Sequence, residues 1–162
     1  NINQLMEHSI SSVIVPENIK ISLESKVNNT EIKLDYDQMT QVFTNLLKNA
    51  IEAMPEEGGL ITVKMTDSND EITVHITDTG TGIEEENMNK LFTPFFTTKP
   101  IGKGTGLGLP IIYGIVKMHK GNITFRSNAD KNKGETGTTF TITLPRMAMR
   151  SRSVRCMFLA AW

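Results

Sequence analysis

The sequence predicts an α+β fold in which a mixed β-sheet carries helices on one of its faces. Apolar residues recur every three or four positions in two segments, 36–54 and 109–119, and this spacing is typical of amphipathic helices. Several short segments before, between and after them alternate apolar and polar residues, as strands do. The order is strands, helix, strands, irregular segment, helix and strands, which indicates a mixed sheet with helices packed on one face.

The N-terminal part of the chain carries weaker signals. Residues 1–12 show a loose helical spacing of apolar side chains, and we expect them to be the end of a preceding helix or a linker. Residues 19–23 alternate apolar and polar, residues 32–34 do so again, and an Asn-Asn pair at 28–29 is typical of a turn. This pattern predicts a β-hairpin.

A long helix and a second hairpin follow. Asp35 and Gln38 form a capping-box pattern, and the helical spacing of apolar residues continues up to Pro55. Residues 60–65 and 71–76 then alternate with a period of two on either side of a short polar turn. The pattern predicts a helix and then two antiparallel strands.

The C-terminal half begins with an irregular segment, 84–103, which holds a short helix candidate, a cluster of phenylalanines and two prolines. A long segment without periodicity is typical of a lid over a binding site. A helix is predicted over 109–119, and strands over 122–127 and 138–144. The basic and apolar tail, residues 147–162, is expected to be disordered or non-native.

Composition limits the class of protein. The 162 residues fit one domain, placed at 13–146, and the near balance of 17 Lys+Arg against 18 Asp+Glu gives no sign of nucleic-acid binding or membrane contact. A single cysteine excludes an internal disulfide, and no apolar segment is long enough to cross a membrane. Because the chain starts at Asn1 and not Met, we expect it to be cut from something longer.

Polar residues form a stripe on the first long helix, at steps of three or four, and the stripe is uncharged until its last member: Gln38, Gln41, Asn45, Asn49 and Glu52. A solvated helix face is one interpretation. The other is a binding face, because asparagine is a poor helix former and two of them lie among leucines here. Amide oxygen is a hard ligand that suits Mg²⁺.

Two glycine-rich segments suggest a ligand. Asp78-Thr-Gly-Thr-Gly82 follows a strand; it is either a plain turn or a loop whose glycines admit a flat ligand while the carboxylate accepts hydrogen bonds from an amino group, such as that of adenine. Glycines at 102, 104, 106 and 108 precede the second helix, where free N–H groups can face phosphate. Their spacing fits neither a P-loop nor a Rossmann fingerprint.

Taken in order, these segments resemble the boxes of sensor histidine kinases in the GHKL superfamily. Residues 45–50 (Asn-Leu-Leu-Lys-Asn-Ala) resemble the N box, 78–82 the G1 box, 92–96 (Phe-Thr-Pro-Phe-Phe) the F box, and 104–108 (Gly-Thr-Gly-Leu-Gly) the G2 box. Gly137-Thr138 resembles the closing strand motif, so the likeness covers residues 16–145. It implies the Bergerat fold, a two-layer α/β sandwich with a mixed, mostly antiparallel sheet.

The resemblance also implies roles for individual residues. Asn49 would bind Mg²⁺, Asn45 would support the phosphates or the ion, and Asp78 would hold the adenine amino group. Lys99 would reach the terminal phosphate, although a solvated lysine is an equal alternative. The phenylalanines of residues 92–96 would anchor the lid. The complete set expected around ATP is Asn45, Asn49, Asp78, Gly80, Gly82, Ile83, Phe92, Lys99, Gly104, Thr105, Gly106, Leu107, Gly108, Leu109 and Thr138.

One position bears on the reaction. ATP-hydrolysing relatives carry Glu one helical turn before the metal asparagine, where this chain has Asn45, and an amide cannot act as a general base. A neutral imidazole needs no such base, so the sequence favours transfer to histidine. None of the three histidines has the expected acceptor context, and we expect His75, in a strand, and His119, near a helix end, to be structural or surface residues. Glu52 stands where many relatives have Lys or Arg. A regulatory nucleotide-binding module and a GHKL ATPase are the alternatives.

The expected partners follow from this interpretation. They are ATP, the dimerisation and phosphoacceptor helices of the same kinase and, indirectly, a response regulator. The expected location is cytoplasmic, which includes the cytosolic part of a membrane-bound sensor.

Overall fold

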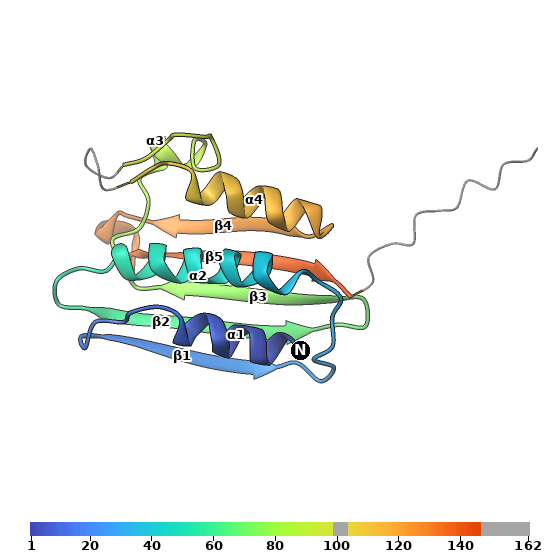
Figure 1. Ribbon diagram of the computed structural model, residues 1–162. Coiled ribbons are helices and arrows are strands. Elements are labelled where there is room, and N and C mark those ends of the chain that lie inside the picture. Colours follow the sequence, from blue (N-terminus) through green and yellow to red (C-terminus); the bar gives the residue numbers. More distant parts are fainter. Residues whose placement is uncertain (99–103, 147–162) are drawn as a thin grey trace, which may run out of the picture.

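Five strands form one mixed sheet in the computed structural model, which describes residues 1–98 and 104–146 (Figure 1). Their order across the sheet is β1-β2-β3-β5-β4, and only the β1–β2 pair is parallel. The strands are β1 (Ile19–Lys26), β2 (Gly59–Asp67), β3 (Glu71–Asp78), β4 (Asn122–Asn128) and β5 (Gly137–Pro145). The prediction of a mixed, mostly antiparallel sheet is confirmed.

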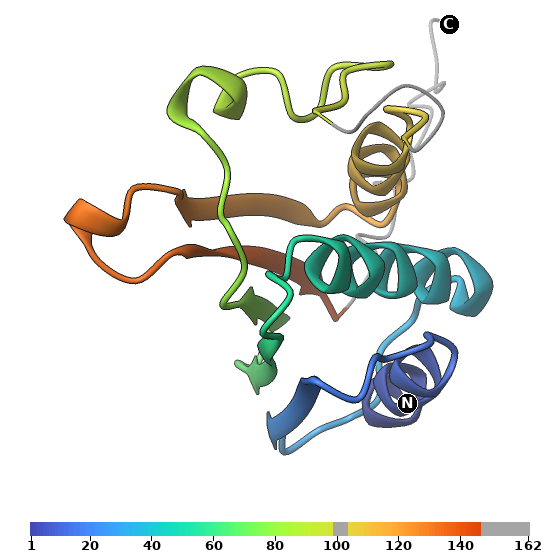
Figure 2. The same cartoon turned by 90° about the vertical axis from the view of Figure 1, so that its left-hand side faces the viewer.

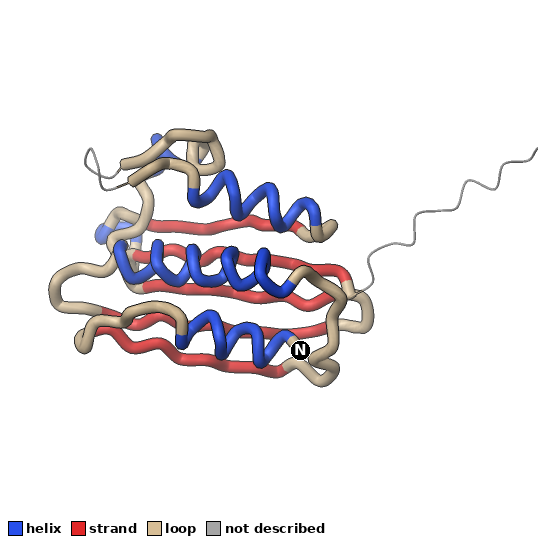
Figure 3. The backbone as a smooth tube through the Cα atoms, viewed as in Figure 1, coloured by secondary structure: helices blue, strands red, loops and turns tan. Residues whose placement is uncertain are grey.

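The three longer helices lie side by side on one face of this sheet (Figures 1 and 2). They are α1 (Ile2–Ser11), α2 (Tyr36–Glu52) and α4 (Gly108–Met118); a short α3 (Glu85–Met88) and a 3₁₀ turn η1 (Lys131–Lys133) lie in the connections. Alternate residues of β2, β3 and β5 are buried and belong to one core cluster with residues of the helices. Helices and sheet form two layers (Figure 3), so the core lies between them. The two-layer prediction is therefore confirmed.

The predicted hairpin of residues 19–23 and 32–34 is wrong. β1 pairs in parallel with β2, in the register Ile19↔Gly59, and residues 32–34 form no strand. Parallel strands need a crossover, and α2 supplies it between β1 and β2. Ile32 and Leu34 alternate with polar neighbours because both are partly buried against the hydrophobic core, in the connection that leads to α2.

Helix α1 occupies the segment that we expected to be the end of a preceding helix or a linker. Its helical character is confirmed, and Asn1 caps it by accepting a hydrogen bond from the Gln4 backbone. Ile2, Leu5 and Met6 are fully or almost fully buried and contribute to the same core as the sheet and α2.

Helix α2 is fixed firmly at its N-terminus. The Asp35 side chain accepts a 3.0 Å hydrogen bond from the Gln38 backbone, which confirms the predicted cap. The Asp35 backbone N–H donates in turn to His119 Nε2, at 2.9 Å. Its buried apolar face covers the sheet, and its C-terminal end lies by the end of β3 (Figure 1). The polar residues of its last two turns are thereby brought to one end of the sheet.

Asp67 and Arg146 join three segments at the opposite end of the sheet. The Asp67 carboxylate accepts hydrogen bonds from the backbone N–H groups of Asn28 and Asn29 and contacts the Arg146 guanidinium, which also donates to the Glu31 carbonyl. The backbone bonds from Asn29 and Asn28, together with the Arg146 charge, lower the pKa of Asp67.

This lowered pKa predicts acid-sensitive stability. A carboxyl whose pKa is lower in the folded state stabilises the fold above its unfolded pKa, and that contribution disappears as the pH falls through the folded value. We expect Asp67→Asn to lower the melting temperature at pH 7, and the difference from wild type to shrink below about pH 4. The control is the exposed Asp70→Asn; thermal unfolding curves with equal offsets at pH 7 and pH 3 would contradict the prediction.

Candidate nucleotide-binding site

Asp78 and Thr138 lie opposite each other where β3 ends and β5 begins, and both are buried, at 6% and 5% exposure. Asp78 Oδ1 accepts hydrogen bonds from the backbone N–H groups of Gly80 (2.9 Å) and Thr138 (3.1 Å). Burial raises the pKa of Asp78, and these two bonds oppose the rise. Within the described part of the chain Oδ2 accepts no hydrogen bond, so this oxygen is available to a ligand.

The loop after Asp78 follows a path that glycine alone allows. A Cβ on Gly80 would lie 2.6 Å from the Ala53 carbonyl oxygen at the end of α2, and Thr81 N donates to that same oxygen. Gly82 has φ +75°, and a Cβ there would lie 2.0 Å from the Asn128 carbonyl oxygen at the end of β4. The loop is thus held between α2 and β4, with its backbone close to Asp78, as a flat ligand requires.

This geometry predicts opposite effects for two glycine-to-alanine changes. Gly82→Ala combines an unfavourable φ with a backbone clash, so we expect it to lower the free energy of unfolding by about 2 kcal/mol or more. Gly114→Ala lies inside α4 with nothing within 4 Å of the added Cβ, and should raise stability by about 0.5–1 kcal/mol. Urea unfolding measures both; equal effects would show that the Gly82 conformation is not required.

Asn45 and Asn49 lie one turn apart near the C-terminal end of α2 and are half-buried. Neither side-chain amide has a hydrogen-bond partner within residues 1–98 and 104–146, although half-buried amides normally find one. Two unpaired amides on the last turns of α2 fit a role in holding an ion or phosphate, because amide oxygen is a suitable Mg²⁺ ligand.

Phe92 fixes the irregular segment to the rest of the domain. Its ring contacts Tyr113 of α4 and Phe125 of β4, with centroids 5.3 Å and 6.0 Å away. Phe95 does not share this role: its side chain is 76% exposed, and its backbone N–H donates to the Gly106 carbonyl at 2.9 Å. The expectation that the phenylalanines together anchor the lid is therefore correct for Phe92 and wrong for the Phe95 side chain.

The second glycine-rich segment lies at the start of α4. Gly106 has φ +65°, and a Cβ on it would lie 2.4 Å from the Phe95 backbone, so the two segments are in direct contact. Gly108 begins the helix. The other predicted residues of this segment, Gly104, Thr105, Leu107 and Leu109, adjoin the same helix start. Lys99 and Gly102 lie outside the described residues.

Ser127 is a site residue that the sequence analysis missed. It is the register partner of Thr138, and its Oγ accepts a 2.8 Å hydrogen bond from the backbone N–H of Ile83. The alternation of β4 could have revealed it, because Ile123 and Phe125 face the core and Ser127 continues their series.

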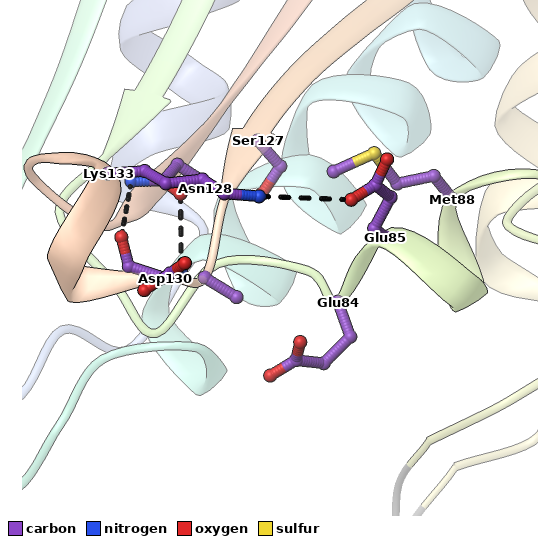
Figure 4. Close-up of a pocket in the computed structure, with 8 residues that line it drawn as sticks. Glu84, Glu85, Met88, Ser127, Asn128, Asp130 and Lys133 are labelled. Atoms are coloured by element: carbon purple, nitrogen blue, oxygen red, sulfur yellow. Dashed lines mark hydrogen bonds and ion pairs between the residues drawn. The ribbon is translucent and has the colours of Figure 1, made fainter.

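A cavity of about 580 Å³ lies beside this cluster, between α3 and the end of β4 (Figure 4). It is lined by Glu84, Glu85, Met88, Ser127, Asn128, Ala129, Asp130 and Lys133. None of the residues predicted to surround ATP lines it. The candidate nucleotide site on the Asp78 side of the glycine loop is therefore distinct from this cavity.

A mixed sheet with helices on one face and a glycine loop after a buried aspartate define a GHKL-type ATP-binding domain. Residues 34–148 match the family described as Histidine kinase-, DNA gyrase B-, and HSP90-like ATPase, and the chain belongs to that family. It is 39% identical over 148 residues to the sensor histidine kinase ZraS of Escherichia coli (strain K12), covering 90% of this chain and 30% of ZraS. The chain thus spans about a third of that relative.

Solved structures show the same fold. The nucleotide-free catalytic domain of the histidine kinase ThkA superposes with a TM-score of 0.72 at 32% identity, covering 90% of this chain and 93% of that one. ThkA in complex with the response regulator protein TrrA gives a TM-score of 0.68 at 27% identity, covering 91% of this chain and 41% of that one. The match therefore extends over almost the whole ThkA catalytic domain.

Proposed function

We propose that this chain is the catalytic domain of a two-component sensor histidine kinase, which transfers the γ-phosphoryl group of ATP to a histidine on a separate dimerisation helix. The observation that carries the proposal is the pair of unpaired amides, Asn45 and Asn49, on the helix that ends beside the buried Asp78. This set offers ligands for Mg·ATP and no carboxylate at the position of Asn45. The likeness to ZraS and to the ThkA catalytic domain supports the same assignment.

The proposed pocket divides into a base end and a phosphate end. At the base end, Asp78 Oδ2 accepts from the adenine amino group, Thr138 lies beside it, and Gly80, Gly82 and Ile83 line the base. Two bonds to Oδ1 orient the carboxylate before the ligand arrives, which lowers the cost of ordering it on binding.

At the phosphate end, Asn49 is the proposed Mg²⁺ ligand and Asn45 supports the phosphates or the ion. Mg²⁺ bound there would neutralise phosphate charge. At the start of α4, the backbone N–H groups of Gly104, Thr105, Gly106, Gly108 and Leu109 have no partner within the described residues and would face the phosphates. Leu107, whose N–H donates to Thr105 Oγ1, lies among them, and Phe92 holds the segment that covers them. Lys99, outside the described residues, is proposed to reach the terminal phosphate.

Transfer to an imidazole suits these residues better than hydrolysis. Phosphoryl transfer depends mainly on in-line positioning and charge stabilisation, and a neutral imidazole is nucleophilic without a base. Water is a poor nucleophile unless a base activates it, and the amide of Asn45 cannot accept its proton. Attack by water is therefore expected to be slow.

The chain's own histidines have other partners, which supports an acceptor on a different segment. His75 Nδ1 lies 3.0 Å from Thr141 Oγ1 on the open face of the sheet. His119 bridges the Asp35 backbone N–H and the Ile115 carbonyl, and the His8 ring packs at a tilt against the Tyr36 ring. The expectation that His75 and His119 are structural or surface residues agrees with these contacts.

The partners and location follow from the same proposal. The chain would contact the phosphoacceptor helices of its own kinase and, through them, a response regulator; the complex of ThkA with TrrA is a precedent in a relative. ATP as substrate argues for a cytoplasmic location. No helix in the described part of the chain is long and apolar enough to cross a membrane.

The direct test mixes the chain with Mg·[γ-³²P]ATP and a separate dimerisation segment that contains a phosphoacceptor histidine. We expect acid-labile label on that segment and none on this chain, with the two polypeptides separated by size. Saturating ATP binding without label would favour a regulatory nucleotide-binding module. Release of free phosphate without the segment would favour an ATPase.

A further inference from the structure

The Ser127 hydroxyl is the centre of a small hydrogen-bond network behind the adenine end of the proposed pocket. Its Oγ lies 2.8 Å from the Ile83 backbone nitrogen, 2.9 Å from the Gly137 carbonyl oxygen and 2.8 Å from Thr138 Oγ1. Ser127 and Thr138 are directly paired across β4 and β5. Thr138 in turn donates its backbone N–H to Asp78.

The direction of each bond follows from a count of donors and acceptors. A serine hydroxyl has one hydrogen to donate and two lone pairs to accept with. The Gly137 carbonyl can only accept and the Ile83 N–H can only donate, so the hydrogen of Ser127 goes to Gly137. For all three bonds to form, the Thr138 hydroxyl must donate to Ser127. The outer side of Thr138 Oγ1 then carries lone pairs alone.

Thr138 and Asp78 therefore both present acceptors at the base end of the pocket. They are register partners, both are buried, and within the described ranges the Thr138 hydroxyl has no other partner. An adenine amino group offers two hydrogens to this pair. A 6-oxopurine would place its own acceptor oxygen against the same two acceptors.

We propose that Ser127 is a positioning residue that fixes Thr138 as a hydrogen-bond acceptor and thereby makes the site select 6-aminopurines over 6-oxopurines. The inference rests on the proposed function, because it needs the nucleotide base beside Asp78. Without Ser127, the Thr138 hydroxyl is free to rotate and donate to the oxygen of a 6-oxopurine, while Asp78 is unchanged.

The test compares the binding of ADP and inosine 5′-diphosphate, which differ in the substituent at position 6 and in the proton at N1. In the wild type, the dissociation constant of inosine 5′-diphosphate should exceed that of ADP. We expect Ser127→Ala to lower the ratio of the first constant to the second by about 3- to 10-fold, the range that one hydrogen bond contributes. Loss of packing around the loop should weaken both nucleotides alike, so the ratio separates the proposed role from a structural one. Titration calorimetry provides both constants.

Three variants complete the test. Ser127→Thr keeps the hydroxyl and should restore the wild-type ratio. Thr138→Val should narrow the ratio by itself, and it keeps the inference testable if Ser127→Ala does not fold. Adding Ser127→Ala to Thr138→Val should cause no further narrowing, because Ser127 acts through the Thr138 hydroxyl.

The outcomes separate the two proposals. If the wild-type chain binds neither nucleotide, the proposed function fails and this inference with it. If the chain binds ADP but Ser127→Ala or Thr138→Val leaves the ratio unchanged, this inference alone is overturned. The same holds if Ser127→Ala narrows the ratio equally with and without the Thr138 hydroxyl.

Discussion

Replacing Asp78 by asparagine is expected to weaken ADP and ATP binding by about 100-fold or more without unfolding the domain. Asparagine has the same shape, and its Oδ1 can keep the bonds from Gly80 and Thr138. Its amide nitrogen then replaces the oxygen that faces the adenine amino group, so that two donors meet. An unpaired buried donor costs about 1–3 kcal/mol on each side, and 1.4 kcal/mol is a tenfold change in affinity.

The stability of the same variant separates a binding defect from a folding defect. Because burial raises the pKa of Asp78, its negative charge opposes folding at neutral pH, and a neutral asparagine removes that cost. We expect the ligand-free variant to melt at or above the wild-type temperature. Calorimetric titration with ADP measures the binding loss, and an unchanged affinity would contradict the whole assignment.

The pH dependence of nucleotide affinity is a second test of the role of Asp78. Only the carboxylate form of Asp78 presents two acceptors, so wild-type affinity should fall as the pH drops through its raised pKa. The asparagine variant has no proton to gain at this position. Its weak affinity should change with pH only as far as the nucleotide itself takes up protons, so the difference between the two proteins reports on Asp78.

Asn49→Ala is expected to abolish the Mg²⁺-dependent part of nucleotide binding and to lower phosphotransfer to the acceptor segment by at least about 100-fold. The asparagine amide has no hydrogen-bond partner within the described ranges, so the fold loses no hydrogen bond with it. Alanine also has a higher helix propensity than asparagine. The stability of the free domain should therefore be unchanged or slightly raised.

The matched control is Lys48→Ala, an exposed change on the same helical turn. ADP binding measured with and without Mg²⁺ should show a metal effect in wild type and in the Lys48 variant, and none in the Asn49 variant. A full metal effect in Asn49→Ala would remove this residue as the ion ligand. It would leave the adenine end of the pocket intact.

The sequence predicted those elements whose signals are local. Asp35 caps α2 at the expected residue, and the β2–β3 hairpin forms because both strands alternate around a short turn. The prediction of a hairpin from 19–23 and 32–34 was wrong, because alternation of apolar and polar residues indicates that one face of a strand is buried and does not indicate which strand pairs with it. β1 found its partner 40 residues away, across the α2 crossover.

Around the candidate site, the sequence pointed to residues with unusual burial or backbone conformation, whereas their contact with ATP stays a prediction. The burial of Asp78 and the backbone conformations of Gly82 and Gly106 are as a ligand loop requires. Ser127 was not predicted, because a serine within a strand does not by itself indicate a binding site. Its role depends on its pairing with Thr138 across β4 and β5. The Phe95 side chain was misjudged because composition does not distinguish an anchoring aromatic from an exposed one.

The central claim is that ATP binds where β3 ends, between α2 and the glycine segments. Amide hydrogen exchange with and without a saturating, non-hydrolysable Mg·ATP analogue tests it most directly. We predict slower exchange at residues 79–83, 104–109 and 137–138, and no change at 28–31 or 68–70 at the far end of the sheet. Unchanged exchange at 79–83, or protection confined to 129–133 beside the cavity, would contradict the claim.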